Sequence, residues 1–423
     1  MSLAQRMKEI REGFQPAFWV ANFTELFERL AYYGPQAVLA IYLHEHLRLT
    51  SEQTTWLIGY YGFVVWFMPI VGGALADRFG FRRTLAGAFF ILAVGNFLLG
   101  SLSASWMAPV RAALPLFALM HLLMLIPAMG PAVVKPVVVG TTARAAKENV
   151  RSVGYSIYYT VVNIGAAIGP IVASFVRTTV GVESVFLVSA AATLAMAFVT
   201  LLFYREPDRG SEPRVASIGA AFRNLVRVLG DGKFVLFLVI FSGFWVVFWQ
   251  QYLSLPLYVR TYVDPNANID RLLAVEATTV ILLTFVVNYL TRKVPAFPAI
   301  IAGVLISSLS WLFLTLGTST WLIVAALILL AIGEVTQAPR YYEYISRLAP
   351  PGQQGLFMGY AFLPIGIGYL IGGRVAGWSL RYFGETLHQP ARMWYLFAGA
   401  GVLTSVLLAL YHRFVKPESA ASR

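Results

Sequence analysis

The chain has 423 residues, of which 58% are hydrophobic and 12% charged, and its mean hydropathy is +0.69. Soluble domains carry about a quarter of charged residues, so this composition excludes a soluble globular protein and indicates an integral membrane protein. The net charge of +12 is compatible with nucleic-acid binding, but basic residues also accumulate in the cytoplasmic loops of membrane proteins. The absence of cysteine excludes disulfides and thiolate chemistry.

Twelve apolar stretches, each of about 20 residues or more, are predicted to cross the membrane. They cover residues 14–43, 53–76, 84–103, 112–140, 152–176, 183–204, 234–261, 271–291, 296–316, 320–344, 354–380 and 391–414. Because their number is even, both termini are expected on the same side of the membrane. The loops after even-numbered spans hold most of the arginine and lysine, which predicts that both termini are cytoplasmic.

One long polar segment, residues 205–233, separates the spans into two sets of six. It contains Pro207, Gly210 and Pro213, followed by basic residues at helical spacing, which predicts a cytoplasmic linker with an amphipathic helix. The predicted domains are therefore an N-terminal six-helix bundle (1–204), the linker (205–233) and a C-terminal six-helix bundle (234–423). Two bundles joined in this way are expected to enclose a central cavity and to rock about it.

Three charged residues, Glu25, Glu28 and Arg29, lie in the middle of the first span. Their spacing of three and four residues places them on one face of a helix. An ionised side chain facing lipid costs roughly several kcal/mol, so this face is expected to line a protein interior or a watery cavity. The alternative is a charge cluster that only ties helices together.

The segment between the second and third spans reads G-A-L-A-D-R-F-G-F-R-R from Gly73 to Arg83. It resembles the loop motif of the major facilitator superfamily. The resemblance implies the fold of that superfamily, an all-α integral membrane protein with twelve transmembrane helices in two bundles around a central cavity. Glycines allow close helix contact and a tight turn, and Asp77 is expected to cap a helix end or meet an arginine. The predicted conformational latch is Gly73, Asp77, Arg78, Gly80 and Arg82, with an ordinary basic loop as the alternative.

Four regions, in order, resemble the proton-dependent oligopeptide transporter family within that superfamily. They are E-x-x-E-R-x-x-Y-Y-G from Glu25 to Gly34, Lys135-Pro136 in the fourth span, Tyr158 to Gly165 in the fifth span, and Glu334 with Leu348-Ala349-Pro350 around the tenth. The resemblance implies a secondary active transporter that couples protons to the movement of peptide-like or other small zwitterionic solutes by alternating access.

The chain departs from that family at three places. Pro35 and Gln36 follow the Y-Y-G, where the family has a second arginine, and Trp249 replaces an acid of the seventh span. In the family these two positions can face each other as a gate pair, and both partners are missing here. Glu276 stands where the eighth span usually offers an asparagine. These departures favour the alternative of an exporter or carrier of amphiphilic compounds, drugs or lipids.

Glu25, Glu28, Arg29 and Lys135 form the predicted proton-coupling set, because their formal charges balance. A neighbouring cation favours the ionised form of a carboxyl and burial favours the protonated form. Movement of Lys135 toward or away from the glutamates would therefore decide whether a carboxyl keeps its proton. We expect Glu25 or Glu28 to carry the proton, and a static salt-bridge network is the alternative.

The predicted substrate-binding residues combine charged groups for the two ends of a zwitterion with an aromatic wall. Arg29 and Lys135 are suited to a carboxylate, and the family resemblance implies that Glu334 and Asn163 hold an amino group. Glu276 is either a second acid in the cavity or a residue near the membrane surface beside Arg271. The full set is Arg29, Tyr33, Tyr60, Lys135, Tyr158, Asn163, Trp245, Glu276 and Glu334.

The sequence has no phosphate-cradling G-x-x-x-x-G-K-[ST] segment, no metal-spaced cluster and no nucleophile–base pair. We therefore expect no catalytic residue, cofactor or metal, and a carrier rather than an intramembrane enzyme. The expected partners are a small-molecule substrate, protons and the lipid bilayer, without nucleic acid. The expected state is a monomer that crosses the bacterial inner (cytoplasmic) membrane many times.

Overall fold

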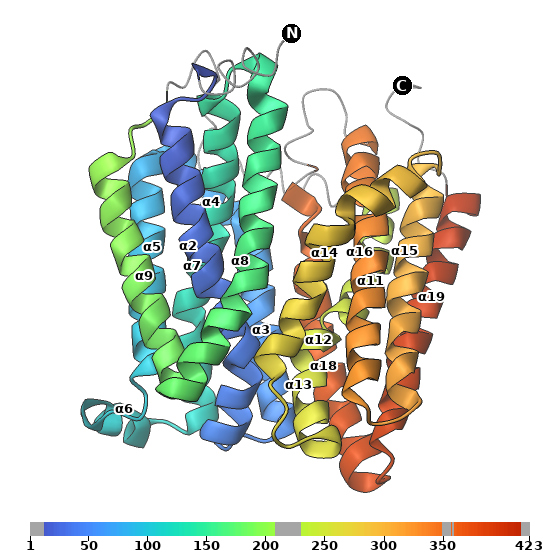
Figure 1. Cartoon of the computed structure of the whole chain (residues 1–423). Coiled ribbons are helices and arrows are strands. Elements are labelled where there is room, and N and C mark those ends of the chain that lie inside the picture. The colour runs from blue at the N-terminus through green and yellow to red at the C-terminus, as the bar shows by residue number, and fades with distance from the viewer. Residues whose placement is uncertain (1–11, 208–229, 349–356, 358, 416–423) are drawn as a thin grey trace. The chain divides into compact units, whose positions relative to one another are not determined.

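The computed structural model describes residues 12–207, 230–348, 357 and 359–415. Within these residues the regular structure is helical, apart from one isolated bridge between Phe14 and Ala146 (Figure 1). The longer helices before the linker are α2 (Pro16–Ile41), α3 (Ser51–Phe67), α4 (Pro69–Phe79), α5 (Phe81–Gly100), α7 (Leu116–Ala145), α8 (Arg151–Thr179) and α9 (Val182–Phe203). Those after it are α11 (Gly232–Phe248), α14 (Ile269–Thr291), α15 (Ala296–Ser310), α16 (Thr320–Leu348), α18 (Leu363–Ser379) and α19 (Met393–Phe414).

Short helical segments complete these elements. They are the π-helices η1 (Tyr42–His46), η4 (Val259–Val263) and η6 (Leu380–Thr386), the α-helices α6 (Ala108–Ala113), α12 (Gln250–Leu253) and α13 (Leu255–Tyr258), and the 3-10 helices η2 (Ser105–Met107), η3 (Glu148–Val150), η5 (Trp311–Thr315) and η7 (Pro390–Arg392). The predicted amphipathic helix of the linker falls on residues 218–229, which lie outside the described residues.

Each of the twelve predicted spans coincides with helical structure, which confirms the all-α membrane fold. Nine helices of the described chain are long and apolar enough to cross a bilayer. The other three predicted spans are not among these nine helices, because one is more charged and two are shorter. The central turns of α2 carry three charged residues, and α3 and α18 have 17 residues each. The helix α4 continues α3 beyond a break at Pro69, and η6 continues α18.

The contacts of the backbone divide the chain into two compact units. The first unit contains the chain up to Gln36 and from Met68 through α9. The second contains Ala37–Phe67 and the helices from α11 to α19. The C-terminal part of the first span and α3 therefore pack with helices that are distant in sequence. The domain boundaries expected from the sequence remain a prediction.

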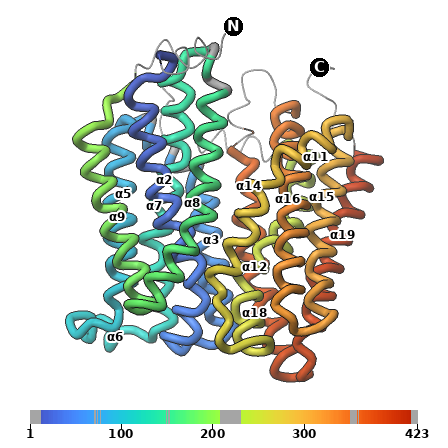
Figure 2. Tube along the Cα trace, viewed as in Figure 1, coloured from blue at the N-terminus to red at the C-terminus, as the bar shows by residue number. Residues whose placement is uncertain are grey.

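In the first unit, α5 packs against both α9 and α7 (Figure 2). Close approach of α5 and α7 depends on Gly95, because a Cβ atom at this position would lie 2.5 Å from Cδ of Pro127. Small residues at such crossings are the usual device in membranes, where lipid removes the hydrophobic drive for helix association. The helix α7 runs without interruption through Pro127, Pro131 and Pro136.

In the second unit, α3 packs along α18 with almost no space between the two backbones. A Cβ atom at Gly59 would lie 2.6 Å from the carbonyl oxygen of Tyr369, and one at Gly373 would lie 2.5 Å from that of Thr55. Two ion pairs of the second unit involve the start of α3 or the short helices η1, η4 and η6. Arg260 binds Glu45 with both Nε and Nη2 at 2.8 Å, and Arg381 lies 3.3 Å from Glu52.

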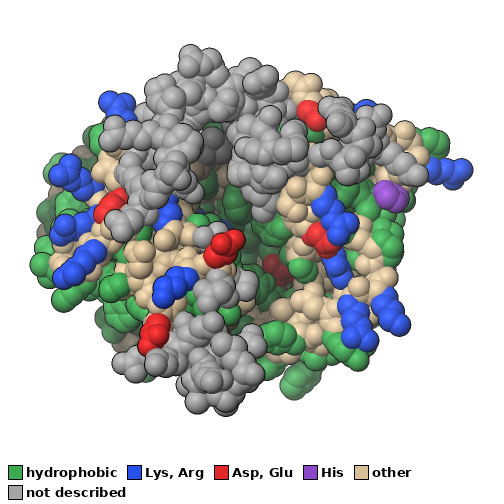
Figure 3. All heavy atoms as spheres, turned by 90° about the horizontal axis from the view of Figure 1, so that it is seen from above, with side chains coloured by type: hydrophobic (Ala, Val, Ile, Leu, Met, Phe, Trp, Pro, Cys, Tyr) green, Lys and Arg blue, Asp and Glu red, His purple; other side chains and the backbone are tan. Residues whose placement is uncertain are grey.

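Lysine and arginine side chains are spread over the helix ends seen in Figure 3. Arg82, Arg83, Lys147 and Arg205, which belong to loops predicted to be cytoplasmic, are exposed. The assignment of these loops to the cytoplasm remains a prediction from the charge bias.

The tight contact of α3 and α18 predicts that Gly373→Ala lowers the unfolding temperature of the purified protein, because overpacking at a rigid backbone contact costs about 1–3 kcal/mol. The matched control is Gly399→Ala in α19, where an added Cβ meets nothing within 4 Å. We expect no loss of stability there, and a thermal unfolding series in detergent compares the two variants. Equal unfolding temperatures for both variants would contradict the packing argument.

Candidate functional site

The charged face of α2 is brought level with α7 by contacts at one end of both helices. The amide of Gln15 donates to the carbonyl of Ala145 at 2.8 Å, and the amide of Lys147 donates to that of Gly13 at 2.9 Å. Glu25 lies ten residues after Gln15, and Lys135 lies ten residues before Ala145. At about 1.5 Å per residue both side chains are therefore about 15 Å from the shared anchor. Glu25 and Lys135, which are distant in the sequence, therefore lie at the same depth along the two helices.

Glu25, Glu28 and Arg29 form a buried ion cluster in the first unit. Glu25 and Glu28 have exposed fractions of 0% and Arg29 of 2%. Nε of Arg29 lies 3.1 Å from Oε1 of Glu25, and its Nη2 contacts Oε2 of Glu28. Lys135 of α7, half-buried, interacts electrostatically with all three. The structure thus brings the four predicted proton-coupling residues together.

Two of the predicted tyrosines complete this cluster. Tyr33 and Tyr158 both interact electrostatically with the guanidinium of Arg29. Gly165 of α8 lies directly against Cβ of Arg29, so that a larger residue there would collide with α2. The cluster is therefore enclosed by α2, α7 and α8, with charges that sum to zero when both carboxyls are ionised.

The ion pairs of this cluster depend on charge more than on aligned hydrogen bonds. The carboxylate oxygens of Glu25 and Glu28 are buried and receive no well-aligned hydrogen bond from the described residues. Nε and Nη2 of Arg29 likewise donate no well-aligned hydrogen bond within this part of the chain. Buried polar groups in native proteins are normally satisfied, and exceptions concentrate at functional sites. Chemically, such a cluster can exchange a proton against the movement of a neighbouring cation.

A second acidic pair lies in the other unit, where α14 packs against α16. Glu276 of α14 is 7% exposed, and its carboxyl faces that of Glu334 within hydrogen-bonding reach. Val280, Ala331 and Val335 of the same two helices form a buried apolar cluster. Glu276 is thus buried beside Glu334, whereas Arg271 on the same helix is exposed, and the place of Glu276 in a cavity remains a prediction. The expectation that the Glu276–Glu334 pair and the ion cluster on α2 share one central cavity remains a prediction.

The remaining predicted binding residues have different surroundings. Trp245 of α11 is 8% exposed and stacks on Trp249 with ring centroids 5.5 Å apart. Tyr60 of α3 is half-buried. Asn163 of α8 donates from its amide nitrogen to the carbonyl of Tyr159 at 2.8 Å, so this donor serves its own helix.

The predicted latch forms the turn between α4 and α5. Gly80 adopts φ +87°, a conformation that favours glycine, between Phe79 and Phe81. Arg82 donates to the carbonyl of Leu201 on α9. Arg78 is exposed and lies over the Phe79 ring, while the side chains of Gly73 and Asp77 fall outside the described part of the chain.

Sequence reasoning missed the residue that caps this turn. Glu206, just after α9, accepts from the amides of Phe81 at 2.6 Å and Arg82 at 3.0 Å, the first residues of α5. A carboxylate at a helix N-terminus satisfies free amides and complements the helix dipole. Acids and arginines are mixed in the segment after α9, so no local signal singles out Glu206.

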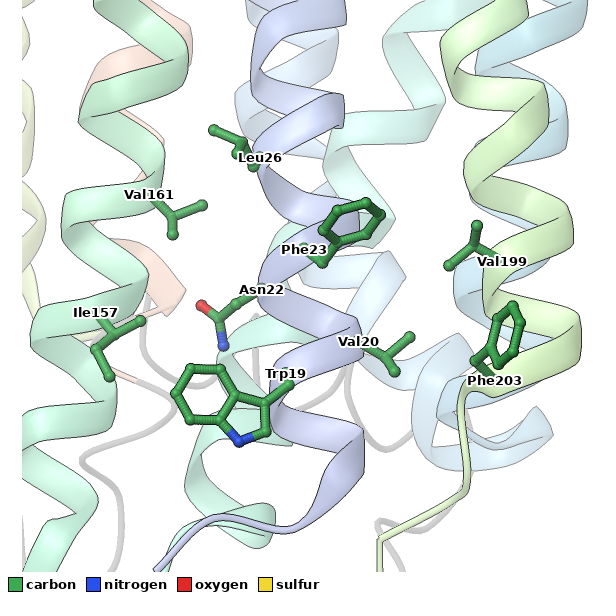
Figure 4. Close-up of a pocket in the computed structure, with 9 residues that line it drawn as sticks. All are labelled: Trp19, Val20, Asn22, Phe23, Leu26, Ile157, Val161, Val199 and Phe203. Atoms are coloured by element: carbon green, nitrogen blue, oxygen red, sulfur yellow. The ribbon is translucent and has the colours of Figure 1, made fainter. Parts of the chain in front are cut away.

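A groove of about 480 Å³ runs between α2, α8 and α9 in the first unit (Figure 4). Its lining is apolar except for Asn22 and includes Trp19 and Phe23, which are 46% and 49% exposed. None of the four cluster residues lines it. Because these helices span the membrane, we interpret the groove as part of the lipid-facing surface.

The fold and the intramembrane charges define a multi-pass secondary transporter. A sequence model of the Major Facilitator Superfamily matches residues 22–266 and 266–423, and the chain belongs to this family. The superfamily predicted from the loop motif is thereby confirmed.

Relatives of known name lie at low identity. "Multidrug resistance protein MdtH" of Photorhabdus laumondii subsp. laumondii is 22% identical over 394 residues, which cover 93% of each chain. A crystal structure of a POT family transporter in complex with 5-aminolevulinic acid superposes with a TM-score of 0.76 at 18% identity, over 94% of this chain and 96% of that one. The nucleoside transporter NupG superposes with a TM-score of 0.78 at 12% identity, over 93% and 99% of the two chains. At such identities the structural likeness shows the fold alone.

The buried ion cluster predicts a strong and pH-dependent effect of Arg29→Met. Removing Arg29 leaves Lys135 as the one cation beside two buried carboxylates, and the uncompensated negative charge costs about 3–5 kcal/mol of unfolding free energy. The loss should shrink at pH 5 relative to pH 8, because protons can then neutralise the carboxylates. Unfolding temperatures at both pH values check this.

The control for this prediction is Arg347→Met. Arg347 pairs with Glu343 at 2.5 Å, but its side chain is 70% exposed. Exposed ion pairs contribute about 0–1 kcal/mol, so we expect little change. A similar small change in Arg29→Met would show that the cluster is not sequestered.

Proposed function

We propose that this protein is a proton-coupled carrier of peptide-like or other small zwitterionic solutes that works by alternating access. The observation that supports the proposal is the buried ion cluster of Glu25, Glu28, Arg29 and Lys135. An arrangement with no net charge costs less to hold in the membrane, and moving one cation out of it requires a proton to restore neutrality.

Lys135 is the mobile cation of the proposed mechanism. It lies on α7, whereas both glutamates and Arg29 lie on α2, so a shift between two helices changes its distance from the carboxyls. When a substrate carboxylate binds Lys135 or Arg29, one glutamate loses part of its electrostatic support and takes up a proton. We assign the proton to Glu28 or Glu25, and the carboxylate end of the solute to Arg29 and Lys135 with Tyr33 and Tyr158 beside them.

The second unit would bind the amino end of the solute. Glu276 and Glu334 act electrostatically on each other, and among the described residues no lysine or arginine acts strongly on either carboxyl. The charged residues of the same helices are Asp270 and Arg271 near the start of α14, and Arg340, Glu343 and Arg347 near the end of α16. Arg340 is engaged with Glu343 at 3.0 Å and with the carbonyl of Thr291 at 3.2 Å. A protonated amine would supply the missing positive charge, with Tyr60 and Trp245 of the same unit as further contacts.

The second candidate function is an exporter or carrier of amphiphilic compounds, drugs or lipids. It is favoured by Trp249, which occupies the place of a family acid and is packed among aromatic rings. The name of the curated relatives points in the same direction. For either function we propose a monomer in the bacterial inner membrane with both termini in the cytoplasm, and a latch of Gly73, Asp77, Arg78, Gly80 and Arg82.

The proton-coupled reading predicts that an inward proton gradient drives uptake of small peptides into proteoliposomes and that Glu28→Gln abolishes it. Glutamine keeps the shape of the side chain but cannot exchange a proton. The control is Glu343→Gln, which changes a partly exposed carboxyl outside the cluster and should retain uptake. Unchanged uptake in Glu28→Gln would remove this residue from the coupling mechanism.

Lys135→Ala separates coupling from binding. We expect loss of proton-driven accumulation with retained counterflow exchange of labelled solute, because the carrier can still reorient when fully loaded. Accumulation at the wild-type level would refute the role of Lys135.

The two candidate functions are separated by a ligand screen at two pH values. A ligand raises the unfolding temperature according to its occupancy of the folded state. Stabilisation by di- and tripeptides, reduced by Glu334→Gln, supports the first function. Stabilisation by amphiphiles alone supports the second and overturns the first.

A further inference from the structure

Five aromatic side chains of the second unit form a continuous aromatic row. Its members are Trp245, Trp249, Trp66, Phe362 and Tyr342, and successive ring centroids lie 5.5, 6.5, 5.9 and 6.2 Å apart. They come from α11 and its C-terminal cap, α3, the start of α18 and α16. Trp249 also stacks on Tyr369, with centroids 4.0 Å apart and an interplanar angle of 21°.

The aromatic row ends in two buried hydrogen-bond donors that lack an acceptor. Trp245 and Trp249 are 8% and 7% exposed, and Nε1 of each indole donates to no group of the described residues. By contrast, Nε1 of the fully buried Trp311 in the same unit donates to the carbonyl of Val247 at 3.1 Å. Trp245 and Trp249 are four residues apart, so their indoles lie on one side of the chain.

Native proteins rarely bury a donor without an acceptor, and two such donors side by side call for a shared explanation. Their unused N–H groups fit a ligand that brings the acceptor itself. The other end of the row is accessible, because Trp66, Phe362 and Tyr342 are only half-buried. The row carries no charged side chain, since Trp249 stands where the resembling family has an acid.

We infer that the aromatic row binds an uncharged aromatic moiety that carries a hydrogen-bond acceptor, such as an aryl ketone or aryl amide. The ring of the ligand packs against the aromatic side chains, where offset or edge-to-face contacts are favourable. Its acceptor oxygen receives a hydrogen bond from Nε1 of Trp249 or Trp245. The inference rests on the proposed carrier function and adds a substrate class to it: Trp249 selects solutes with an aromatic, acceptor-bearing part.

A matched pair of probes tests this site. 2-Acetylnaphthalene and 2-ethylnaphthalene have similar shape, but only the ketone can accept a hydrogen bond. Equilibrium dialysis of the full chain in nanodiscs against empty nanodiscs corrects for partition into lipid. We expect the wild type to bind the ketone about fivefold more tightly than the hydrocarbon, as one net hydrogen bond implies.

Trp249→Phe keeps an aromatic ring and removes the donor. We expect it to reduce the preference for the ketone to less than about twofold and to leave binding of the hydrocarbon unchanged, with Trp245→Phe,Trp249→Phe abolishing the preference. Trp378→Phe is the control, because Trp378 is 41% exposed and stacks on Tyr382 outside the row. Equal binding of both probes by the wild type, or a full preference in the double variant, overturns the inference.

Unfolding temperature gives a second readout that needs no ligand. Both Trp249→Phe and Trp311→Phe lose packing volume, but only Trp311→Phe also loses a made hydrogen bond, so it should lower the unfolding temperature more than Trp249→Phe does. An equal loss in both variants would mean that Trp249 has a structural acceptor and would overturn the inference. Proton-driven uptake of dialanine by the wild type tests the proposed carrier function separately from this site. Failure of that uptake in the wild type counts against the carrier proposal and leaves the probe preference to be judged separately.

Discussion

The ion cluster around Arg29 is the interaction on which the rest of the first unit depends. A guanidinium held between two carboxylates inside a membrane is tolerable only where protein, and not lipid, surrounds all three groups. That requirement fixes which face of α2 turns inward. It also explains why α7 contributes a lysine at the same depth and why α8 contributes a glycine, Gly165, at the point of contact. Loss of the enclosing protein surface, of the lysine on α7 or of the close contact with α8 would leave a buried charge of the cluster without its partner.

Close packing of backbones is the second constraint, and it comes from the solvent. In lipid, burying a leucine against another helix gains little, so association depends on contact area and on small residues that allow it. The pairs Gly59 with Gly373 and Gly95 with Pro127 supply this contact in the second and first units respectively. Because the hydrophobic effect contributes little to helix association in lipid, polar contacts at the helix ends contribute a larger share of the stability. Glu206 on the start of α5 and Glu45 on Arg260 are examples.

Sequence reasoning recovered the features that depend on local pattern. The apolar spans follow from composition, and the shared face of Glu25, Glu28 and Arg29 follows from helical spacing. The partnership of Lys135 came from family resemblance, and the structure places it in the cluster. Partners without a local signature were out of reach. Glu206 caps an amide 125 residues away, and Glu45 meets an arginine 215 residues away. The burial of Glu276 likewise depends on the packing of α14 against α16, which no spacing within one helix encodes.

This chain differs from the resembling family in where it places charged residues and aromatic packing. The resembling family uses an arginine in the first span and an acid in the seventh, whereas this chain has Gln36 and Trp249 at those places. Within the second unit an acid and an arginine meet as Glu45 in η1 and Arg260 in η4, with the acid on the earlier segment and the arginine on the later one. Their side chains are 34% and 23% exposed, so the pair requires less desolvation than one at mid-membrane. At the seventh-span position, Trp249 stacks on Tyr369 with ring centroids 4.0 Å apart, a contact that requires no counterion. The second unit thus combines an ion pair that water reaches with an aromatic stack that buries no charge.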